Sequence, residues 1–269
     1  MNEEEVRDWT ELYSRRVLAR SNPRRTSHST RISTVLNLFF LFVAHHHKRH
    51  QTMARGRFIL LEGCDRAGKS TQCAKLVAAL QDKGHAVELC KFPDRTTTIG
   101  QMIHAYLTNA KELDDKAIHL LFSANRWEAM QQMKRKLRAG THLIVDRYAY
   151  SGVAFSTAKG LDLTWCKNPD RGLVRPDLTF FLDLPTADAE KRGGFGEERY
   201  EKRELQEKVR EVFLQLKSKE WVMIDARHSV QAMHHEILKV TEDKIRAGER
   251  DAEFAEEDDE LLEDLFLDS

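Results

Sequence analysis

The chain lacks the residue patterns that mark several common classes of protein. Its four cysteines form neither a C-x-x-C pair nor any other metal-ligand spacing, so we expect reduced thiols rather than a disulfide framework or a zinc site. No apolar run approaches the roughly 20 residues that a membrane-spanning helix needs. The 43 lysines and arginines equal the 43 aspartates and glutamates, so the chain as a whole shows no charge footprint for nucleic acid. We therefore expect neither a membrane span nor a nucleic-acid partner.

The balanced total charge hides three regions of different composition. Residues 1–54 include a stretch, positions 12–34, with six arginines and no acidic residue. Residues 55–248 alternate short apolar runs with helical patterns. In the remaining region, residues 249–269, positions 251–269 hold ten acidic residues and no lysine or arginine. We expect one folded domain between two disordered ends.

The N-terminal extension, residues 1–54, has two competing interpretations. Its arginine-rich and serine-rich composition is typical of a mitochondrial transit peptide, although acids such as Glu3 and Asp8 lie where such peptides avoid them. Alternatively, translation starts at Met53, just before the first apolar run, and the upstream segment is dispensable or not translated at all. We expect the protein in the cytoplasm, with the nucleus or, through the extension, the mitochondrion as alternatives.

The acidic tail, residues 249–269, also carries bulky apolar residues. These are Leu261, Leu262, Leu265, Phe266 and Leu267. We expect a tail of this composition to be solvated and disordered. The alternative is a binding segment that folds on a partner of unknown identity.

A glycine-rich segment, Gly63–Ser70, has the spacing G-x-x-x-x-G-K-S and follows directly on the apolar run Phe58–Leu61. Glycines let the backbone curl so that several N–H groups converge on phosphate oxygens, and the helix that follows directs its positive end toward them. Lys69 is expected to reach the β- and γ-phosphates of a nucleotide, and the Ser70 hydroxyl to bind Mg²⁺. This segment predicts a phosphate-binding loop.

The phosphate loop itself carries two charged residues, Asp65 and Arg66. Phosphates would repel the carboxylate unless it points away from them. We therefore expect Asp65 to face the acceptor side, where a sugar hydroxyl can bind it. Arg66 is expected to offset the charge that develops on a transferring phosphoryl group.

The middle region is predicted to be an α/β domain, because short apolar runs alternate with helical patterns as in βαβ units with a parallel sheet. The runs are nearly continuously apolar, as strands covered on both faces should be. The predicted strands are Arg57–Glu62, Ala86–Lys91, His142–Asp146, Leu178–Leu184 and Trp221–Asp225. The predicted helices include Gly68–Lys83, Asp114–Ala139, Glu201–Lys219 and Ser229–Arg246.

Charged residues follow two of the predicted strands. Ligands of an open parallel sheet collect beyond the carboxyl ends of its strands, so Asp146 and Arg147 should lie beside the phosphate loop. Asp146 can hold Mg²⁺ through water or orient an attacking oxygen, and Arg147 can bind a second phosphate. Arg95, after the second strand, is a further candidate anion clamp. Two arginines beyond those on a nucleotide donor suggest a phosphorylated acceptor.

Two further segments suggest a base-binding site and a mobile lid. Phe122 and Arg126 lie four apart on one predicted helical face, where a ring can stack on a planar base and a guanidinium can bond its edge. Residues 192–200 carry three glycines between helical segments. A lid at about 185–203 is therefore expected to close over a substrate and exclude water.

Taken together, these segments resemble the thymidylate kinase family of nucleoside monophosphate kinases, from about Arg57 to Arg246. Five blocks in order carry the resemblance: Asp-Arg-Ala-Gly-Lys-Ser-Thr, Phe-Pro-Asp-Arg, His-Leu-Leu-Phe-Ser-Ala-Asn-Arg-Trp-Glu, Asp-Arg-Tyr-Ala-Tyr-Ser-Gly-Val-Ala-Phe and Phe-Gly-Glu-Glu-Arg-Tyr-Glu. Arginine within the phosphate loop is similar to the eukaryotic type of the family. The resemblance implies a three-layer P-loop nucleoside monophosphate kinase fold, with a five-stranded parallel sheet flanked by helices, and a homodimer.

The resemblance also implies a role for each matching residue. Contacts to ATP are implied for Arg66, Ala67, Gly68, Lys69, Ser70, Thr71 and Arg192. Contacts to thymidine monophosphate (dTMP) are implied for Asp65, Phe92, Arg95, Phe122, Arg126, Arg147, Tyr148, Ser151, Gly152, Phe155 and Tyr200. The catalytic residues would be Arg66, Lys69, Asp146 and Arg147, with Mg²⁺ held by Ser70 and Asp146.

The expected function is ATP-dependent phosphorylation of dTMP to thymidine diphosphate (dTDP), a step in dTTP biosynthesis, with Mg²⁺ as cofactor. Two alternatives stay open. A deoxynucleoside kinase also has a phosphate loop, but it would not need Arg95 and Arg147 as clamps for an acceptor phosphate. A nucleotide-binding regulator or scaffold would act through the two ends of the chain, yet Lys69, Arg66 and Asp146 are all present.

Overall fold

Five apolar segments form one parallel sheet at the centre of the computed structural model, which describes residues 54–192, 198–254 and 265–266. The strands are β1 (Phe58–Glu62), β2 (Val87–Lys91), β3 (His142–Asp146), β4 (Leu178–Asp183) and β5 (Trp221–Asp225). Each observed boundary lies within one residue of the predicted one. The prediction succeeds because strands buried on both faces have nearly continuous apolar runs.

The strand order places the phosphate loop at the middle of one edge of the sheet. The order is β2-β3-β1-β4-β5, so β1 is central. Leu61 near the end of β1 is in register with Asp146, and Glu62 with Phe181 of β4. Because all strands run parallel, their carboxyl ends meet at this edge, and Gly63–Ser70 starts between the ends of β3 and β4.

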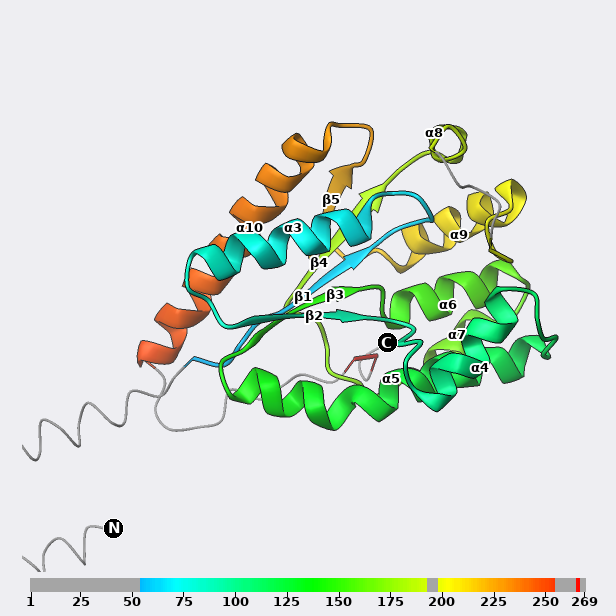
Figure 1. Ribbon diagram of the computed structural model, residues 1–269, viewed down its shortest axis with the longest axis horizontal. Helices are drawn as coiled ribbons and strands as arrows, with labels where there is room; N and C mark the ends of the chain where they lie inside the picture. Colours follow the sequence, from blue (N-terminus) through cyan, green and yellow to red (C-terminus); the bar gives the residue numbers. More distant parts are fainter. Residues whose placement is uncertain (1–53, 193–197, 255–264, 267–269) are drawn as a thin grey trace, which may run out of the picture. The chain divides into compact units, whose positions relative to one another are not determined.

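Helices cover both faces of the sheet and make a three-layer fold (Figure 1). One face carries α3 (Lys69–Asp82) and α10 (Val230–Phe254). The other carries α5 (Asp115–Arg138), α6 (Ala149–Ala158) and α9 (Arg203–Leu216), with α4 (Thr98–Leu107) against α5. The short elements are α7 (Leu163–Lys167), η2 (Asn168–Asp170) and α8 (Thr186–Ala189).

Alternate residues of the strands fill two different cores. Ile59 and Leu61 of β1 belong to a buried cluster with residues of α3 and α10. Phe58 and Leu60, on the opposite face of the same strand, belong to a second cluster with residues of α5. This two-sided burial is what a central parallel strand requires. All four cysteines lie among the described residues as free thiols, as predicted.

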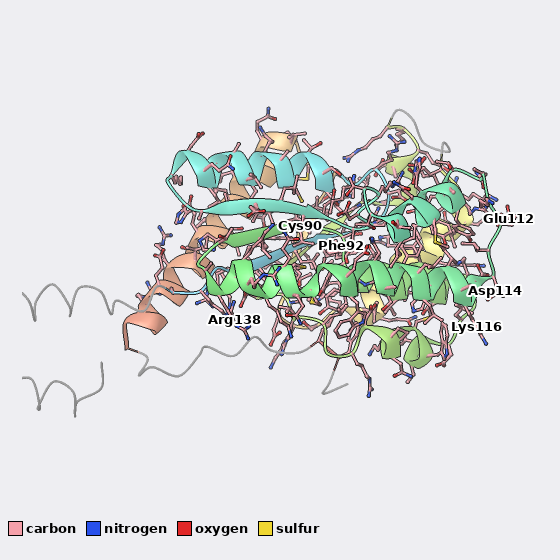
Figure 2. All side chains as sticks on the ribbon, turned by 60° about the horizontal axis from the view of Figure 1, so that its bottom comes forward. Cys90, Phe92, Glu112, Asp114, Lys116 and Arg138 are labelled. Carbon is pink, nitrogen blue, oxygen red and sulfur yellow. The ribbon has the colours of Figure 1, made fainter. Side chains whose placement is uncertain are left out.

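Helix α5 begins and ends at clear sequence signals (Figure 2). The Asp114 carboxylate accepts hydrogen bonds from the backbone N–H groups of Lys116 (2.8 Å) and Ala117 (3.3 Å), which satisfies amides of the first turn. The last turn carries the basic residues Arg135, Lys136 and Arg138 near the negative end of the helix dipole. These signals explain why the predicted helix agrees with α5 within one residue at each end.

Helices α4, α6, α7 and α8 were not predicted from the sequence. Helix α6 matters most, because it follows β3 at the ligand-binding edge. Its residues, 149–158, are buried or half-buried along their whole length, since α6 packs against α5, α7 and α9. A helix enclosed in this way has no polar face, so its sequence shows no helical period.

The two ends of the chain lie mostly outside the described residues. Residues 1–53, nearly all of the predicted extension, and residues 255–264 and 267–269 of the predicted tail are outside them, as are the internal residues 193–197 of the predicted lid. Helix α10 continues to Phe254, six residues past the predicted domain boundary at 248. Leu265 and Phe266 depart from the disorder expected of the tail, because they pack on the domain. Within the described part, no helix is long and apolar enough to cross a membrane.

Candidate active site

The phosphate loop joins β1 to α3 through a tightly curled backbone. Gly68 has a φ of 97° and Arg66 a φ of 62°, both in the left-handed region. Glycine adopts this conformation without steric cost, whereas it costs an arginine roughly 1–2 kcal/mol. A Cβ at Gly63 would lie 2.5 Å from the carbonyl oxygen of Leu182. The loop therefore needs its glycines for both curvature and close packing, and it leads directly into the positive end of α3.

Lys69 is the first residue of α3, and its ammonium group curls back onto the loop. Nζ donates a hydrogen bond to the carbonyl oxygen of Cys64 at 2.7 Å. Burial, together with the nearby Arg147 guanidinium, lowers the pKa of Lys69 to about 8, while the carboxylates of Asp65 and Asp146 oppose the shift. A phosphate bound to the loop would favour the protonated amine, because opposite charges stabilise each other.

Ser70, in the first turn of α3, and Asp146, at the end of β3, bring two side-chain oxygen atoms together. The Ser70 hydroxyl donates a hydrogen bond to Oδ2 of Asp146 at 2.5 Å. In the part of the chain that the structure describes, no group of three or more His, Cys, Asp or Glu side chains forms a metal site. An open pair of oxygens still fits Mg²⁺, which keeps several waters and is held by one or two protein oxygens together with substrate phosphates.

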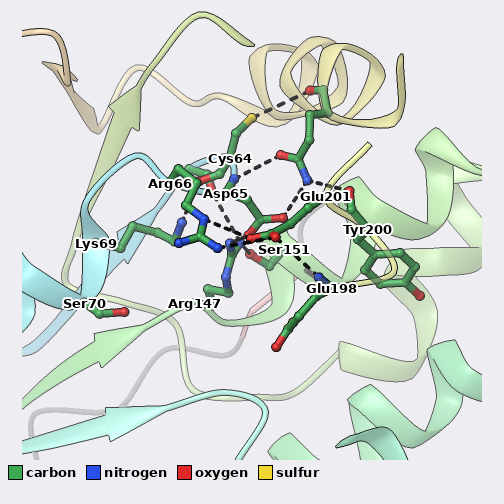
Figure 3. A network of polar contacts seen from close by, with 12 residues as sticks. Cys64, Asp65, Arg66, Lys69, Ser70, Arg147, Ser151, Glu198, Tyr200 and Glu201 are labelled. Atoms are coloured by element: carbon green, nitrogen blue, oxygen red, sulfur yellow. Dashed lines mark hydrogen bonds and ion pairs between the residues drawn. The ribbon is translucent and has the colours of Figure 1, made fainter. Parts of the chain in front are cut away.

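Arg147 connects the end of β3 with the phosphate loop (Figure 3). Its guanidinium donates hydrogen bonds to the carbonyl oxygen of Gly63 and to Oγ of Ser151, both at 3.1 Å. It also forms an ion pair with Asp65. Asp65 is held on its other oxygen by Nε2 of Gln206 in α9, at 2.5 Å. The loop carboxylate and the arginine therefore fix each other beside the phosphate-binding amides.

Glu62, the last residue of β1, supports this junction and was not predicted as a site residue. Its buried carboxylate accepts hydrogen bonds from the backbone N–H groups of Tyr148 (2.9 Å) and Ser151 (3.0 Å), and from the Ser151 hydroxyl (2.5 Å). Tyr148 is the N-cap of α6 and provides no side-chain cap, so Glu62 satisfies these amides from another element. Burial raises the pKa of Glu62, and the hydrogen bond from the Ser151 hydroxyl opposes this by lowering it. The one feature of the sequence that could have indicated this role is that Glu62 is an acidic residue at the end of the apolar run Phe58–Leu61.

Arg126 is a buried arginine that points at α6. Its Nε and Nη2 donate to the buried carboxylate of Asp170, at 3.1 Å and 2.6 Å. A Cβ at Gly152 would lie 2.8 Å from Nη2 of Arg126, so only glycine leaves room for the guanidinium here. Asp170 was not predicted as part of the site, because no local pattern links the residues that follow α7 to α5.

Aromatic rings line the cavity near this arginine. Phe155 and Tyr200 stack with ring centroids 5.4 Å apart and an angle of 29° between their planes. The Arg147 guanidinium lies 5.5 Å from the centre of the Phe155 ring. Phe122 is half-buried on the same cavity. Flat apolar surfaces combined with a few guanidinium groups suit a planar, polar-edged ligand.

Two glutamates of the predicted lid hold two of the predicted anion-binding arginines, and Figure 3 shows the first pair, Glu201 and Arg66. Oε1 of Glu201 accepts from Nε of Arg66 at 3.0 Å. The Glu198 carboxylate accepts from Nη2 of Arg95 at 2.8 Å and 3.0 Å. A carboxylate and a phosphate oxygen bind a guanidinium in the same way. Both glutamates belong to the Phe-Gly-Glu-Glu-Arg-Tyr-Glu block that carries the family resemblance, but no role was predicted for either.

Arg192 links the phosphate loop to the segment after β5. Its Nη1 donates to the carbonyl oxygen of Arg66 at 2.7 Å, and its Nη2 to that of Ala226 at 2.5 Å. Residues just before and at the start of α10 complete this side of the cavity: His228, Ser229, Val230 and Met233. These four were not predicted as site residues, because they belong to no motif. They line the cavity only because β5, which precedes them, brings the chain to this side of the site.

One cavity of about 810 Å³ brings nearly all the predicted site residues together. Among the predicted set, Ala67 is the exception, because it is fully buried in the core behind the loop. The cavity lining includes Asp65, Arg66, Gly68, Lys69, Ser70, Thr71, Phe92, Arg95, Phe122, Arg126, Asp146, Arg147, Tyr148, Ser151, Gly152, Phe155, Arg192 and Tyr200. Such a volume accommodates ligands of nucleotide size.

Comparisons with known proteins point to one family. The thymidylate kinase family model matches residues 61–237. A thymidylate kinase from Arabidopsis thaliana is 53% identical over 192 residues, which cover 71% of this chain and 73% of the relative. A thymidylate kinase from Homo sapiens is 52% identical over 198 residues, which cover 72% of this chain and 93% of the relative. The solved structure of thymidylate kinase from Candida albicans matches with a TM-score of 0.65 and 39% identity, over 72% of this chain and 94% of that one.

The chain belongs to the thymidylate kinase family. This confirms the family and the P-loop nucleoside monophosphate kinase fold that the five sequence blocks predicted. The family model begins in β1 and ends in α10, so it covers the phosphate loop, the arginines beside it and the lid. Residues 1–60 and 238–269 lie outside it.

Proposed function

We propose that the protein phosphorylates dTMP to dTDP with ATP as the phosphoryl donor. The observation that carries this proposal is the cavity in which the phosphate loop lies beside the guanidinium groups of Arg95 and Arg147. The loop suits the phosphate chain of a donor. Two further guanidinium groups, each already paired with a carboxylate, suit a phosphorylated acceptor. The thymidylate kinases to which the chain is similar supply the identity of the acceptor.

The donor nucleotide binds through the loop and α3. Backbone amides of the loop and the Lys69 ammonium group bind its phosphates, and Arg192 lies against its adenine. Arg66 moves from Glu201 to the transferring phosphoryl group, where its positive charge stabilises the transition state. The remaining contacts to ATP come from Ala67, Gly68, Ser70 and Thr71.

The acceptor binds on the side of α5 and α6. Arg95 and Arg147 bind its phosphate, and Asp65 binds its sugar hydroxyl. Phe122 stacks on thymine while Arg126 bonds the edge of the base. The rest of the pocket consists of Phe92, Tyr148, Ser151, Gly152, Phe155 and Tyr200.

The chemistry is an in-line attack by an oxygen of the acceptor phosphate on the γ-phosphorus of ATP, with ADP as the leaving group. The protein contributes by positioning the two nucleotides and by supplying positive charge where negative charge develops. Ser70 and Asp146 would hold Mg²⁺, which when bound neutralises charge on the phosphates. Asp146 is the last residue of β3 and Arg147 follows it directly. From there, the two side chains keep the phosphates of the donor and of the acceptor aligned.

We also infer a homodimer. Leu120 and Trp127 lie seven residues apart on α5, so they share one face, and they are 47% and 41% exposed. Large apolar side chains on one exposed helix face favour a protein partner. Sedimentation of the protein should show a dimer, and Leu120→Arg should shift it to a monomer.

Location in the cytoplasm and a place in dTTP synthesis stay predictions. Mass spectrometry of the native N-terminus tests the alternative start sites.

A coupled assay of ADP release across a panel of acceptors tests the function. We expect turnover with dTMP, weak or absent turnover with purine nucleoside monophosphates, and none with thymidine. Turnover of thymidine instead of dTMP would indicate a deoxynucleoside kinase. If the protein bound ATP but phosphorylated no pyrimidine monophosphate, the proposed function would be wrong and a regulatory role would replace it.

A further inference from the structure

Leu265 and Phe266, the short red segment in Figure 1, pack on the domain at a place that the proposed reaction does not use. Leu265 is 2% exposed and shares a buried cluster with Met130 and Leu173. Its backbone N–H donates to the carbonyl oxygen of Leu173 at 2.6 Å, and its carbonyl oxygen accepts from the N–H of Gly172 at 3.2 Å. The tail is thus attached by backbone pairing as well as by an apolar side chain.

Phe266 packs between residues of α6 and α7. Its ring meets Tyr150 of α6 edge to face, with centroids 5.6 Å apart and an angle of 82°. Nζ of Lys167 in α7 lies 5.5 Å from the centre of the Phe266 ring. Tyr150 in turn meets Trp221 of β5 edge to face at 4.7 Å. Both kinds of contact favour one orientation of the ring, so Phe266 is held specifically.

The segment that pairs with Leu265 also carries the partner of a cavity arginine. Asp170 lies two residues before Gly172, and its carboxylate holds the guanidinium of Arg126. Asp170 also accepts a hydrogen bond from the Ser123 hydroxyl at 2.7 Å. Residues 168–174 therefore hold the guanidinium of Arg126 in place.

The helix that contacts Phe266 carries the support of a second cavity arginine. Tyr150 is followed by Ser151, whose Oγ accepts a hydrogen bond from Arg147 at 3.1 Å. Residues 149–158, which contact Phe266 through Tyr150, and residues 168–174, which pair with Leu265, are thus two supports of the cavity joined by two adjacent tail residues. Neither helix α3 nor the start of α10, which line the side proposed for ATP, belongs to the buried cluster of Leu265.

We propose that Leu265 and Phe266 form a clasp that positions the acceptor half of the active site. The clasp holds α6 and residues 168–174 at a fixed separation, so that Arg147 and Arg126 are in place before the acceptor binds. A preorganised site binds more tightly because fewer groups lose freedom on binding. The role assigned to the clasp rests on the proposed function, because it names dTMP as the ligand of this half.

The double substitution Leu265→Ala/Phe266→Ala in the full chain tests the clasp. We expect the KM for dTMP to rise by at least about fivefold, the lower end of ordinary coupling between two sites. The KM for ATP should stay within about twofold, because the side proposed for ATP lies outside the cluster of Leu265. The matched control is Leu261→Ala/Leu262→Ala, which removes similar apolar bulk from the same tail and should leave both KM values unchanged. An unchanged KM for dTMP, or an equal rise in both KM values, would overturn the proposal.

A second pair of variants separates the clasp from general loss of folding. Phe266→Leu keeps apolar bulk but loses the ring contacts to Tyr150 and Lys167, whereas Phe266→Tyr keeps the ring. The tyrosine variant should retain the KM for dTMP of the unaltered chain, and the leucine variant should show part of the rise. Equal KM values in the two variants would show that the ring has no positioning role.

Hydrogen exchange distinguishes failure of the clasp from failure of the proposed function. If the unaltered chain phosphorylates no monophosphate, the proposed function fails. The clasp is then judged by amide exchange in residues 149–158 and 168–174. Exchange there should be faster in Leu265→Ala/Phe266→Ala than in the unaltered chain and in the Leu261/Leu262 control. Identical exchange in all three proteins would overturn the clasp regardless of activity.

Discussion

Nε of Arg66 lies 3.0 Å from Oε1 of Glu201, so a carboxylate of the lid holds the arginine of the phosphate loop. The carbonyl oxygen of Arg66 also accepts a hydrogen bond from Arg192 at 2.7 Å. The left-handed backbone of Arg66 is therefore stabilised by contacts from the lid. In the proposed reaction the phosphoryl group replaces the carboxylate, so the guanidinium exchanges one anion for another and is never left unpaired.

The first prediction concerns Arg66 itself. Arg66→Ala should lower kcat by about a thousandfold or more, the range found for arginines that stabilise phosphoryl transfer, while dTMP still binds. Glu201→Gln keeps the size of the lid side chain and the arginine, so its kcat should fall far less. Steady-state kinetics and calorimetric binding of dTMP measure both effects. Normal turnover in purified Arg66→Ala would refute the assigned role.

The second prediction concerns the pH dependence of ATP binding. Lys69 has a pKa of about 8 because of its burial, and its charged form is lost as pH rises through that value. The Kd for ATP should therefore rise about tenfold between roughly pH 7 and pH 9. Lys69→Arg stays protonated over this range, so its profile should be flat. Calorimetric titrations at both pH values provide the measurement, and parallel profiles for the two proteins would contradict the assignment.

The same pKa shift has a consequence for folding. The unfolded chain holds a proton on Lys69 up to its ordinary pKa of 10.5, whereas the folded protein releases it near pH 8. Between these values the unfolded state binds more protons, so this site destabilises the fold below pH 8, and the penalty disappears as pH rises toward 10.5.

The third prediction concerns Gly152. In Gly152→Ala the new Cβ would lie 2.8 Å from Nη2 of Arg126, so the guanidinium must shift away from its present place. We expect the KM for dTMP to rise by about tenfold, equivalent to about 1.4 kcal/mol of lost binding, with the KM for ATP unchanged. The KM for ATP serves as the internal control. If neither KM changes, Arg126 does not recognise the acceptor from this position.

The fourth prediction concerns the buried ion pair between Arg126 and Asp170. Asp170→Asn leaves the arginine charge buried without its partner, which should destabilise the fold by about 3–5 kcal/mol. Asp243→Asn, which breaks an exposed pair with Arg246 on α10, should have no measurable effect. Urea denaturation of the two variants compares them directly. Similar stability of both would show that the buried pair is dispensable.

Much of the fold followed from short stretches of sequence, and each exception has a physical cause. The five strands were predicted because each is apolar on both faces, and α5 because Asp114 and a basic last turn mark its ends. Helix α6 was missed because its surroundings are protein on all sides, which removes the polar face that reveals a helix. Leu265 was expected in a disordered tail, since no local pattern shows that residues 172–173 can pair with it.

The sequence by itself determined the phosphate loop, the strands that precede the ligand-binding edge and the family, because glycine spacing and apolar runs are local properties of the chain. Only the tertiary structure decided which distant groups support these residues. Glu62 caps α6 from another element, Asp170 holds Arg126, and the lid glutamates hold Arg66 and Arg95. Such pairs depend on the order of the strands and on the path of the chain between them, and no spacing along the sequence records that path.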